Sequence, residues 1–345
     1  MDRFRDRLRQ PAEIHEPHAL SERKLHPHHG VAAAQTSEFR QFSLRPIVGP
    51  SKQGFGCEAL FHADWEDTFR GDRNNNSRIM LDNWLLYGFE ELIGERAVFL
   101  NCTRDTLTSG LLSLLPHSAV FEIPESVVPD DEVLSVCRSL KAAGYRFALD
   151  DFESPEKMEG FLDLVDFIKV DFRHSGRRER ACMLRRLRLT GATLIAENIE
   201  SEEDFREAVE DGFGLFQGHY LGERITYVKK RDTLDPMNCT RILGAMQEPD
   251  FAVEELVQLI NMESGIEGRL LRRANWATPP SVVINSTRDA LEAVGKPELQ
   301  QIVTLAMRAA SEIGVRPRTV PHQWTFRNHS AGAPIRWIDA GAQTA

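Results

Sequence analysis

The stretch RFALDD, from Arg146 to Asp151, decides the fold prediction, because an apolar run too short for a helix ends there in two carboxylates. The preceding segment PDDEVLSVCRSLKAAG (129–144) has a helical pattern, with a proline and acidic residues at its start and a glycine at its end. A strand that follows a helix so closely is typical of an alternating β/α chain. Because two adjacent carboxylates repel each other unless a cation lies near them, the same stretch predicts a cation site at a strand end.

Short apolar runs alternate with longer amphipathic segments from about residue 38 onward. These runs are GFGCEAL (54–60), RAVFLNC (96–102), SAVFEIPE (118–125), YRFALDD (145–151), VDFIKVD (165–171), ATLIAEN (192–198) and FGLFQGHY (213–220). Such alternation predicts a parallel sheet with crossover helices, and seven or so units can close into a (β/α) barrel. An open doubly wound sheet is the alternative, although no Gly-rich phosphate loop follows the first strands.

The 345 residues are enough for two domains. We expect a flexible N-terminal tail at 1–36, a barrel domain at 37–230, a smaller all-helical domain at 236–315 and a C-terminal tail at 316–345. The helical domain is predicted because only helical patterns remain after the barrel segment.

Composition excludes several classes of function. A formal net charge of −10 argues against binding a nucleic-acid polymer, which needs clustered Lys and Arg. The five cysteines form no C-x-x-C pair, so neither a zinc site nor a disulfide framework is indicated. We also find no apolar run of membrane-spanning length and no signal peptide, and therefore expect a cytoplasmic protein that does not associate with membranes.

Polar side chains close the apolar runs. They are Glu58, Asn101, Glu122, Asp150, Asp151, Lys169, Glu197 and Gln217. In a parallel barrel the carboxyl ends of all strands converge on one face, so these groups would meet in one pocket. A single acid after a strand is more often a helix N-cap, but acids at successive strands predict a site for hard cations such as Mg²⁺ or Mn²⁺. Two such ions could activate a water and hold a scissile phosphate.

The same segments resemble a known family. The motifs are CEALFH, FLNCT, FEIPES, ALDDF, FIKVD, AENIES and FQGHYLGERI, in that order. Over about residues 38–228 the chain is similar to EAL-domain cyclic di-GMP phosphodiesterases. The resemblance implies a (β/α)8 TIM-like barrel and one or two Mg²⁺ or Mn²⁺ ions. It also implies hydrolysis of cyclic di-GMP to linear pGpG in bacterial second-messenger signalling.

Roles for individual residues follow from the resemblance alone. The implied metal ligands are Glu58, Asn101, Glu122 and Asp150, with Asp150 bridging to a second ion that Asp151 also holds. Lys169 is implied to touch the attacking water, and Glu197 to be the general base. The implied supporting positions are Glu125, Glu200 and Gln217. The implied substrate-binding positions are Leu60 and His62.

The helical part also resembles a known module. LINMESGIEGRLLRRANWATPPSVVINSTRDALEAVGKPELQQIVTLA (259–306) is similar to the first half of an HDOD domain, and the match covers about 80 residues. The EAL–HDOD order implies that this part is a regulatory or interaction module that binds a protein partner. Members of the barrel family often form dimers, so a homodimer is a further expectation.

Three departures from the family pattern leave two hypotheses open. His62 stands where active enzymes usually have Arg, the common loop DDFGTGYSSL reads DDFESPEKMEG, and AEGVE reads AENIE. A neutral imidazole cannot make the bidentate contact of a guanidinium. One hypothesis, based on the retained acidic ligands and Lys169, is an active phosphodiesterase. The other is a degenerate EAL domain that acts as a cyclic di-GMP receptor or as a protein-interaction regulator through the HDOD-like part.

Overall fold

The computed structural model describes residues 39–61, 73–150, 152, 158–174, 176–230, 232–248, 252–279 and 281–313. The strands are β1 (Phe39–Val48), β2 (Gly54–Phe61), β3 (Ala97–Asn101), β4 (Ala119–Pro124), β5 (Arg146–Asp150), β6 (Phe167–Asp171), β7 (Thr193–Glu197), β8 (Leu215–Phe216) and β9 (Ile225–Lys230). Both predicted tails, His62 and Asp151 lie outside the described residues.

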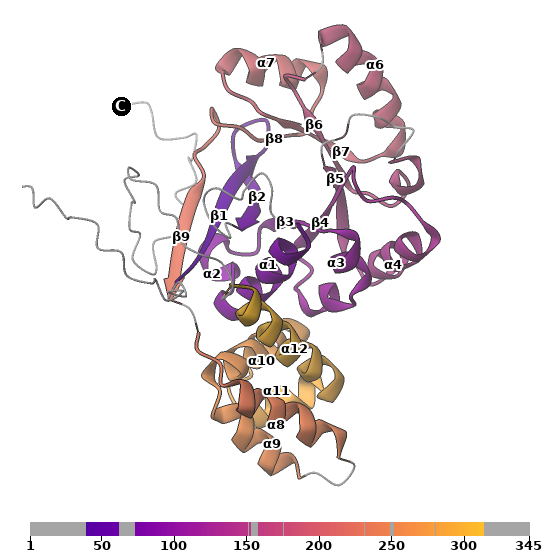
Figure 1. Cartoon of the computed structure of the whole chain (residues 1–345). Coiled ribbons are helices and arrows are strands. Elements are labelled where there is room, and N and C mark those ends of the chain that lie inside the picture. The colour runs from indigo at the N-terminus through magenta and orange to yellow at the C-terminus, as the bar shows by residue number, and fades with distance from the viewer. Residues whose placement is uncertain are drawn as a thin grey trace, which may run out of the picture. The chain divides into compact units, whose positions relative to one another are not determined.

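Strands β1 to β8 form a closed barrel (Figure 1). Strands β2 to β8 follow one another in parallel, and β1 closes the ring because it pairs with both β2 and β8. Strand β9 adds to the free length of β1 outside the ring. The barrel prediction is thereby confirmed, and the open doubly wound sheet is wrong.

Strand β1 is antiparallel to its neighbours, which the sequence analysis did not expect. A hairpin joins β1 to β2, and its tight turn carries Lys52 with φ of 60°. A connection that short can only join antiparallel strands, whereas parallel neighbours need a crossover of a dozen or more residues. Neither β1 nor β9 was among the predicted apolar runs.

Helices cover the outside of the barrel (Figure 1). They are α1 (Arg73–Tyr87), α2 (Glu90–Ile93), α3 (Arg104–Thr108), α4 (Asp131–Ala142), α6 (Arg177–Leu187) and α7 (Glu202–Asp211), with 3-10 turns at Leu111–Leu114, Glu159–Phe161 and Arg188–Thr190. Helix α4 confirms the predicted start and stop. Its N-cap Asp130 accepts a hydrogen bond from the Val133 amide at 3.0 Å, and Gly144 follows with φ of 94°.

The chain after β9 contains helices alone among the described residues. They are α8 (Pro236–Gln247), α9 (Val253–Asn261), α10 (Ser264–Ala277), α11 (Thr287–Val294) and α12 (Lys296–Ile313). Their buried apolar residues include Ile242, Leu256, Leu270 and Ile302. No helix in the described part of the chain is long and apolar enough to cross a membrane.

Candidate active site

The inner surface of the barrel changes from apolar to polar along each strand. A small inner core contains Phe99 of β3, Val120 of β4, Ala148 of β5, Phe167 of β6, Ile195 of β7 and Leu215 of β8. Side chains alternate between the two faces of a strand, so the residue two positions later also points inward. That position is held, in the same order of strands, by Asn101, Glu122, Asp150, Lys169, Glu197 and Gln217.

Lys169 lies at the centre of this polar layer. Its Nζ is 2.9 Å from Glu122 Oε1, 2.9 Å from Asp150 Oδ1 and 2.9 Å from Glu197 Oε1. A fourth carboxylate, that of Glu58, is 3.5 Å away. The lysine side chain is only 1% exposed, so one buried ammonium faces four carboxylates. This group of five residues is called the Lys169 cluster below.

Two further side chains contact Glu58. Gln217 donates a hydrogen bond from Nε2 to Glu58 Oε2 at 3.1 Å, and Arg45 of β1 places its Nη1 3.6 Å from the same oxygen. Arg45 is a site residue that the sequence analysis missed. In the sequence Arg45 could be recognised only by its inward position on β1. That position follows from the pairing of β1 with β2, which the tertiary structure decides.

Burial and the repulsion of neighbouring carboxylates raise the pKa values of two acids in the Lys169 cluster, Glu122 and Glu197. Burial is the main cause for Glu122, whose pKa lies well above its usual range, although Lys169 opposes the shift. The pKa of Glu197 is raised to about 8, mainly by burial and then by Asp150 and Glu58, again against the effect of Lys169. Burial would lower the pKa of Lys169, but the four carboxylates raise it well above its usual range. One ammonium therefore does not neutralise the acids.

The polar atoms of the Lys169 cluster fit a hard divalent cation in their chemistry. Glu122 Oε2 and Gln217 Oε1 are buried and accept no hydrogen bond, while Glu122 Oε1 faces the ammonium of Lys169. Carboxylate and amide oxygens are the donors that Mg²⁺ and Mn²⁺ prefer. Within the described residues, however, no three His, Cys, Asp or Glu side chains are arranged as a ready metal site, since the ammonium of Lys169 lies among the acids.

The predicted residues occupy different depths in the barrel. Asn101, Asp150 and Glu197 end their strands as predicted, and Gln217 follows β8. Glu58, Glu122 and Lys169 were expected to close apolar runs, and this expectation is wrong, because each lies inside its strand. The alternation of inward positions continues past the apolar residues, so the site begins within the strands.

The remaining predicted residues that the structure describes lie at or near the ends of their strands. Asn101 is exposed at the end of β3, Leu60 is half-buried near the end of β2, and Glu125 is half-buried just after β4. Glu200 is exposed after β7 and forms an ion pair with Arg173. The predictions for Asp151 and His62 fall outside the described residues.

The chain after β6 is tied to the chain after β7. Asp171 accepts hydrogen bonds from the amides of Arg173 at 2.8 Å and His174 at 3.1 Å. Asn198 donates to the other oxygen of Asp171 at 2.9 Å and has a left-handed φ of 57°. Asparagine tolerates this backbone conformation better than most residues, which explains how AENIE accommodates the change from glycine.

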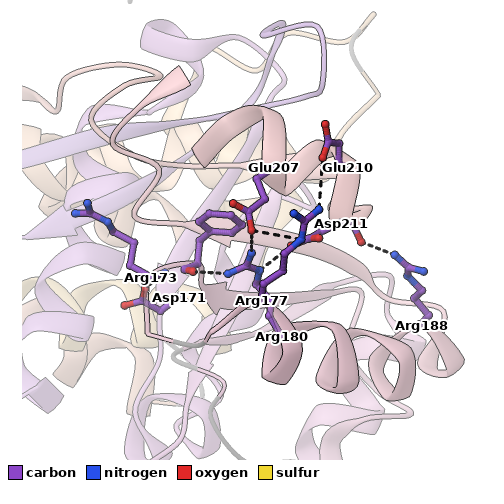
Figure 2. Close-up of polar contacts among 9 residues, drawn as sticks. Asp171, Arg173, Arg177, Arg180, Arg188, Glu207, Glu210 and Asp211 are labelled. Atoms are coloured by element: carbon purple, nitrogen blue, oxygen red, sulfur yellow. Dashed lines mark hydrogen bonds and ion pairs between the residues drawn. The ribbon is translucent and has the colours of Figure 1, made fainter. Parts of the chain in front are cut away.

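A buried arginine supports the same loop from outside the barrel. Arg180 of α6 donates to Asp211 Oδ2 at 2.7 Å, to the Phe172 carbonyl at 3.0 Å and to Glu207. Figure 2 shows Arg177 and Arg180 facing the carboxylates of α7. The Arg180 guanidinium also lies 3.9 Å from the centre of the Phe172 ring, a cation–π contact. Asp211, Glu207, Phe172 and Arg180 are called the Arg180 network below.

Part of the barrel sequence matches a family model. Residues 103–224 match the EAL domain model. The comparisons support the EAL family for the barrel. The matched segment begins after the strand that contains Glu58 and covers Glu122, Asp150, Lys169 and Glu197.

Two curated relatives are similar in sequence. Over 188 residues the chain is 30% identical to the uncharacterized protein YuxH of Bacillus subtilis, covering 52% of this chain and 46% of the relative. Over 272 residues it is 28% identical to the cyclic di-GMP phosphodiesterase CdgJ of Vibrio cholerae, covering 76% of this chain and 62% of the relative. The chain thus spans about half to three fifths of the length of these relatives.

Solved EAL structures are also similar. One is a standalone versatile EAL protein from Vibrio cholerae O395 in its c-di-GMP bound form, at 22% identity and a TM-score of 0.43, covering 54% of this chain and 92% of that one. Another is the EAL domain of Mycobacterium smegmatis DcpA, at 20% identity and a TM-score of 0.45, covering 54% of this chain and 93% of that one.

Proposed function

We propose that this chain hydrolyses cyclic di-GMP to linear pGpG in a reaction that requires Mg²⁺ or Mn²⁺. The observation that carries the proposal is the Lys169 cluster, in which four carboxylates from four strands surround one buried ammonium. The match to the EAL model and the similarity to CdgJ support the same chemistry.

The carboxylates are the groups that would hold the cation. Glu58, Glu122 and Asp150, with the amide oxygen of Asn101, form an all-oxygen donor set that suits Mg²⁺ or Mn²⁺. When bound, such a cation supplies a Lewis acid for the phosphoryl oxygens and offsets the negative charge of the acids. One or two ions fit this proposal, since the position of Asp151 lies outside the described residues.

Glu197 and Lys169 have complementary roles in this mechanism. Glu197 takes a proton at its carboxylate from the attacking water, which a carboxyl group with a raised pKa can do near neutral pH. Lys169 stays protonated, so its ammonium is a fixed positive charge where negative charge develops on the phosphate. Leu60 and His62 are proposed to contact the nucleotide.

Other residues hold these groups in place. Gln217 fixes one oxygen of Glu58 through its side-chain amide, and Arg45 adds a second positive charge beside it. Glu200 is held by Arg173 and, with Glu125, is proposed to support the loops around the site. These contacts reduce the freedom of the carboxylates before any ligand arrives.

A second candidate function is a receptor for cyclic di-GMP without turnover, or a regulator that binds a protein through the HDOD-like helices. It is favoured by the position of Lys169, whose ammonium lies 2.9 Å from Glu122 and from Asp150, two acids that would otherwise hold a cation. The helical part is proposed to bind a protein partner in either case, and a homodimer is compatible with both functions.

Hydrolysis assays separate the two candidates. Purified protein incubated with cyclic di-GMP and either Mg²⁺ or Mn²⁺ should release pGpG, detected by chromatography. The Glu197→Gln variant should bind the nucleotide and hydrolyse it about 10²- to 10⁴-fold more slowly, as expected on removal of a general base. Binding of cyclic di-GMP by calorimetry without product under either ion would instead establish the receptor.

A further inference from the structure

Helix α1 contacts both Asn101, a proposed ligand, and the helices that follow the barrel. Strand β2, which contains Glu58, ends at Phe61, and α1 begins at Arg73. From its first turns, Ser77 donates a hydrogen bond to the backbone carbonyl of Asn101 at 2.9 Å. A movement of α1 would therefore displace the backbone of Asn101, a residue in the proposed ligand set.

A buried arginine of α10 holds the C-terminal half of α1. Arg269 is fully buried and makes a bidentate pair with Asp82 of α1, with Nε 2.7 Å from Oδ1 and Nη2 2.8 Å from Oδ2. Its remaining nitrogen donates to Asp232 at 2.7 Å and to the Gly265 carbonyl at 2.8 Å. A planar guanidinium bonded in this way fixes both the distance and the orientation of its partners.

The C-terminal end of α1 is held by α10 as well. The last turn of α1 contains no basic residue, yet Arg272 donates to the carbonyls of Leu85 and Leu86, both at 2.9 Å. A cation at these carbonyls satisfies groups that a helix end leaves without intrahelical partners. Gly88, with φ of 65°, permits this approach, because a Cβ there would lie 2.5 Å from Arg272 Nε.

Aromatic packing completes the contact. Trp84 of α1 is fully buried and meets the ring of Trp276 of α10 edge to face, with ring centres 6.4 Å apart. Three residues of α10, each about one turn from the next, thus contact the C-terminal half of α1 through an ion pair, hydrogen bonds and ring packing. This contact is called the α1–α10 clamp below.

We propose that Arg269 is a positioning residue for the catalytic centre, acting through Asp82 and α1 on the backbone of Asn101. A displacement of α10 would then change which groups are available to the cation. The helical part would in this way affect the site in the barrel. The proposal rests on the proposed function for its catalytic meaning, but the coupling itself is a property of the fold.

A matched pair of variants in the full-length protein tests the proposal. Arg269→Met removes the clamp's central contact. Arg273→Met is the control, because Arg273 lies on the same helix but pairs with Glu298 of α12, at 2.9 Å, rather than with a residue of α1. In Arg269→Met, amide hydrogens of α1 should exchange at least about tenfold faster, whereas those of α4 keep their protection.

Two further readouts connect the clamp to the site. The affinity for Mn²⁺, measured by calorimetry, should fall roughly tenfold in Arg269→Met and stay unchanged in Arg273→Met, the range typical of coupling between sites. Half-maximal hydrolysis should require correspondingly more Mn²⁺. If Arg269→Met does not fold, Arg269→Lys keeps the charge without the bidentate geometry and should show the same changes in smaller measure.

The proposal is overturned if Arg269→Met and Arg269→Lys leave α1 exchange and Mn²⁺ affinity unchanged, or if Arg273→Met changes them equally. Failure of the proposed function has a different signature, because the wild-type protein would then release no pGpG. Amide exchange in α1 is measured without nucleotide or metal. It therefore shows whether the α1–α10 clamp restrains α1 even if the protein is not a phosphodiesterase.

Discussion

The Lys169 cluster and the Arg180 network are both buried groups of opposite charges, but they are balanced differently. Around Lys169, four carboxylates face one ammonium, and the buried Oε2 of Glu122 accepts no hydrogen bond. Around Arg180, two carboxylates and a backbone carbonyl use the donors of one guanidinium, and the ring of Phe172 covers its face.

This difference is the one expected between a structural ion-pair network and the proposed functional site. A buried ion pair with its hydrogen bonds satisfied fixes the geometry of the elements that it joins. Excess carboxylates raise one another's pKa values and have a net cost until a cation or a proton arrives. The Arg180 network is balanced by its own contacts, whereas the Lys169 cluster is the site that we propose to bind a cation.

Breaking the balanced site should have the largest effect on stability. Arg180→Met leaves Asp211 and Glu207 without their buried cation and should reduce the free energy of unfolding by about 3–5 kcal/mol. Urea unfolding of the variant measures the loss. Arg177 is the control, because its exposed side chain pairs with Glu207 and Glu210 at 3.8 and 3.6 Å, so Arg177→Met should change stability by less than about 1 kcal/mol. Equal losses would contradict the assignment of Arg180 (Figure 2).

Adding a divalent cation should stabilise the unbalanced site. Mn²⁺ at about 100 times its dissociation constant should raise the free energy of unfolding by about 2.7 kcal/mol, because it binds the folded state alone. Thermal melts with and without chelator measure the change. Asp150→Asn should remove most of the effect, while Asp211→Asn should leave the increment from Mn²⁺ intact. If Mn²⁺ does not change the thermal unfolding of the wild-type protein, the proposed metal site is contradicted.

Removing one acid from the Lys169 cluster should stabilise the metal-free protein, in contrast to the loss expected at Arg180. Because the pKa of Glu197 is raised from 4.5 to about 8, folding favours its protonated form, and stability should fall as the pH rises through this interval. Glu197→Gln should flatten that dependence and raise the free energy of unfolding by about 1–3 kcal/mol at neutral pH. Chelator-treated protein unfolded in urea at several pH values checks this, and an unchanged slope would refute it.

The smallest effect is expected at Asn198, which lies between the two regions. Asn198→Gly keeps the left-handed backbone and loses one exposed hydrogen bond to Asp171, so stability should change by less than about 0.5 kcal/mol. Asn198→Ala combines that loss with a strained φ and should cost about 1–2 kcal/mol. If both variants cost the same, the side chain of Asn198 matters more than its backbone.

Much of the barrel could be predicted from local patterns. The apolar runs mark β2 to β8 because a strand needs only a few consecutive apolar residues, and the acidic first turn of α4 marks its start. The antiparallel β1 could not be recognised this way, because its role depends on pairing with β2 and β8 at once.

The site shows the same division. The sequence determined which residue types are available, and the convergence of parallel strands on one face predicted that Asn101, Glu122, Asp150, Lys169, Glu197 and Gln217 would meet, although it did not predict that Glu122 and Lys169 lie inside their strands. That Lys169 lies at the centre, and that Arg45 approaches Glu58, was decided only by closure of the ring. The α1–α10 clamp is likewise invisible in the sequence, since Asp82 and Arg269 are far apart along the chain and only tertiary packing buries them together. Side-chain periodicity is local, whereas the burial that turns a charge into a site depends on contacts between distant strands and helices.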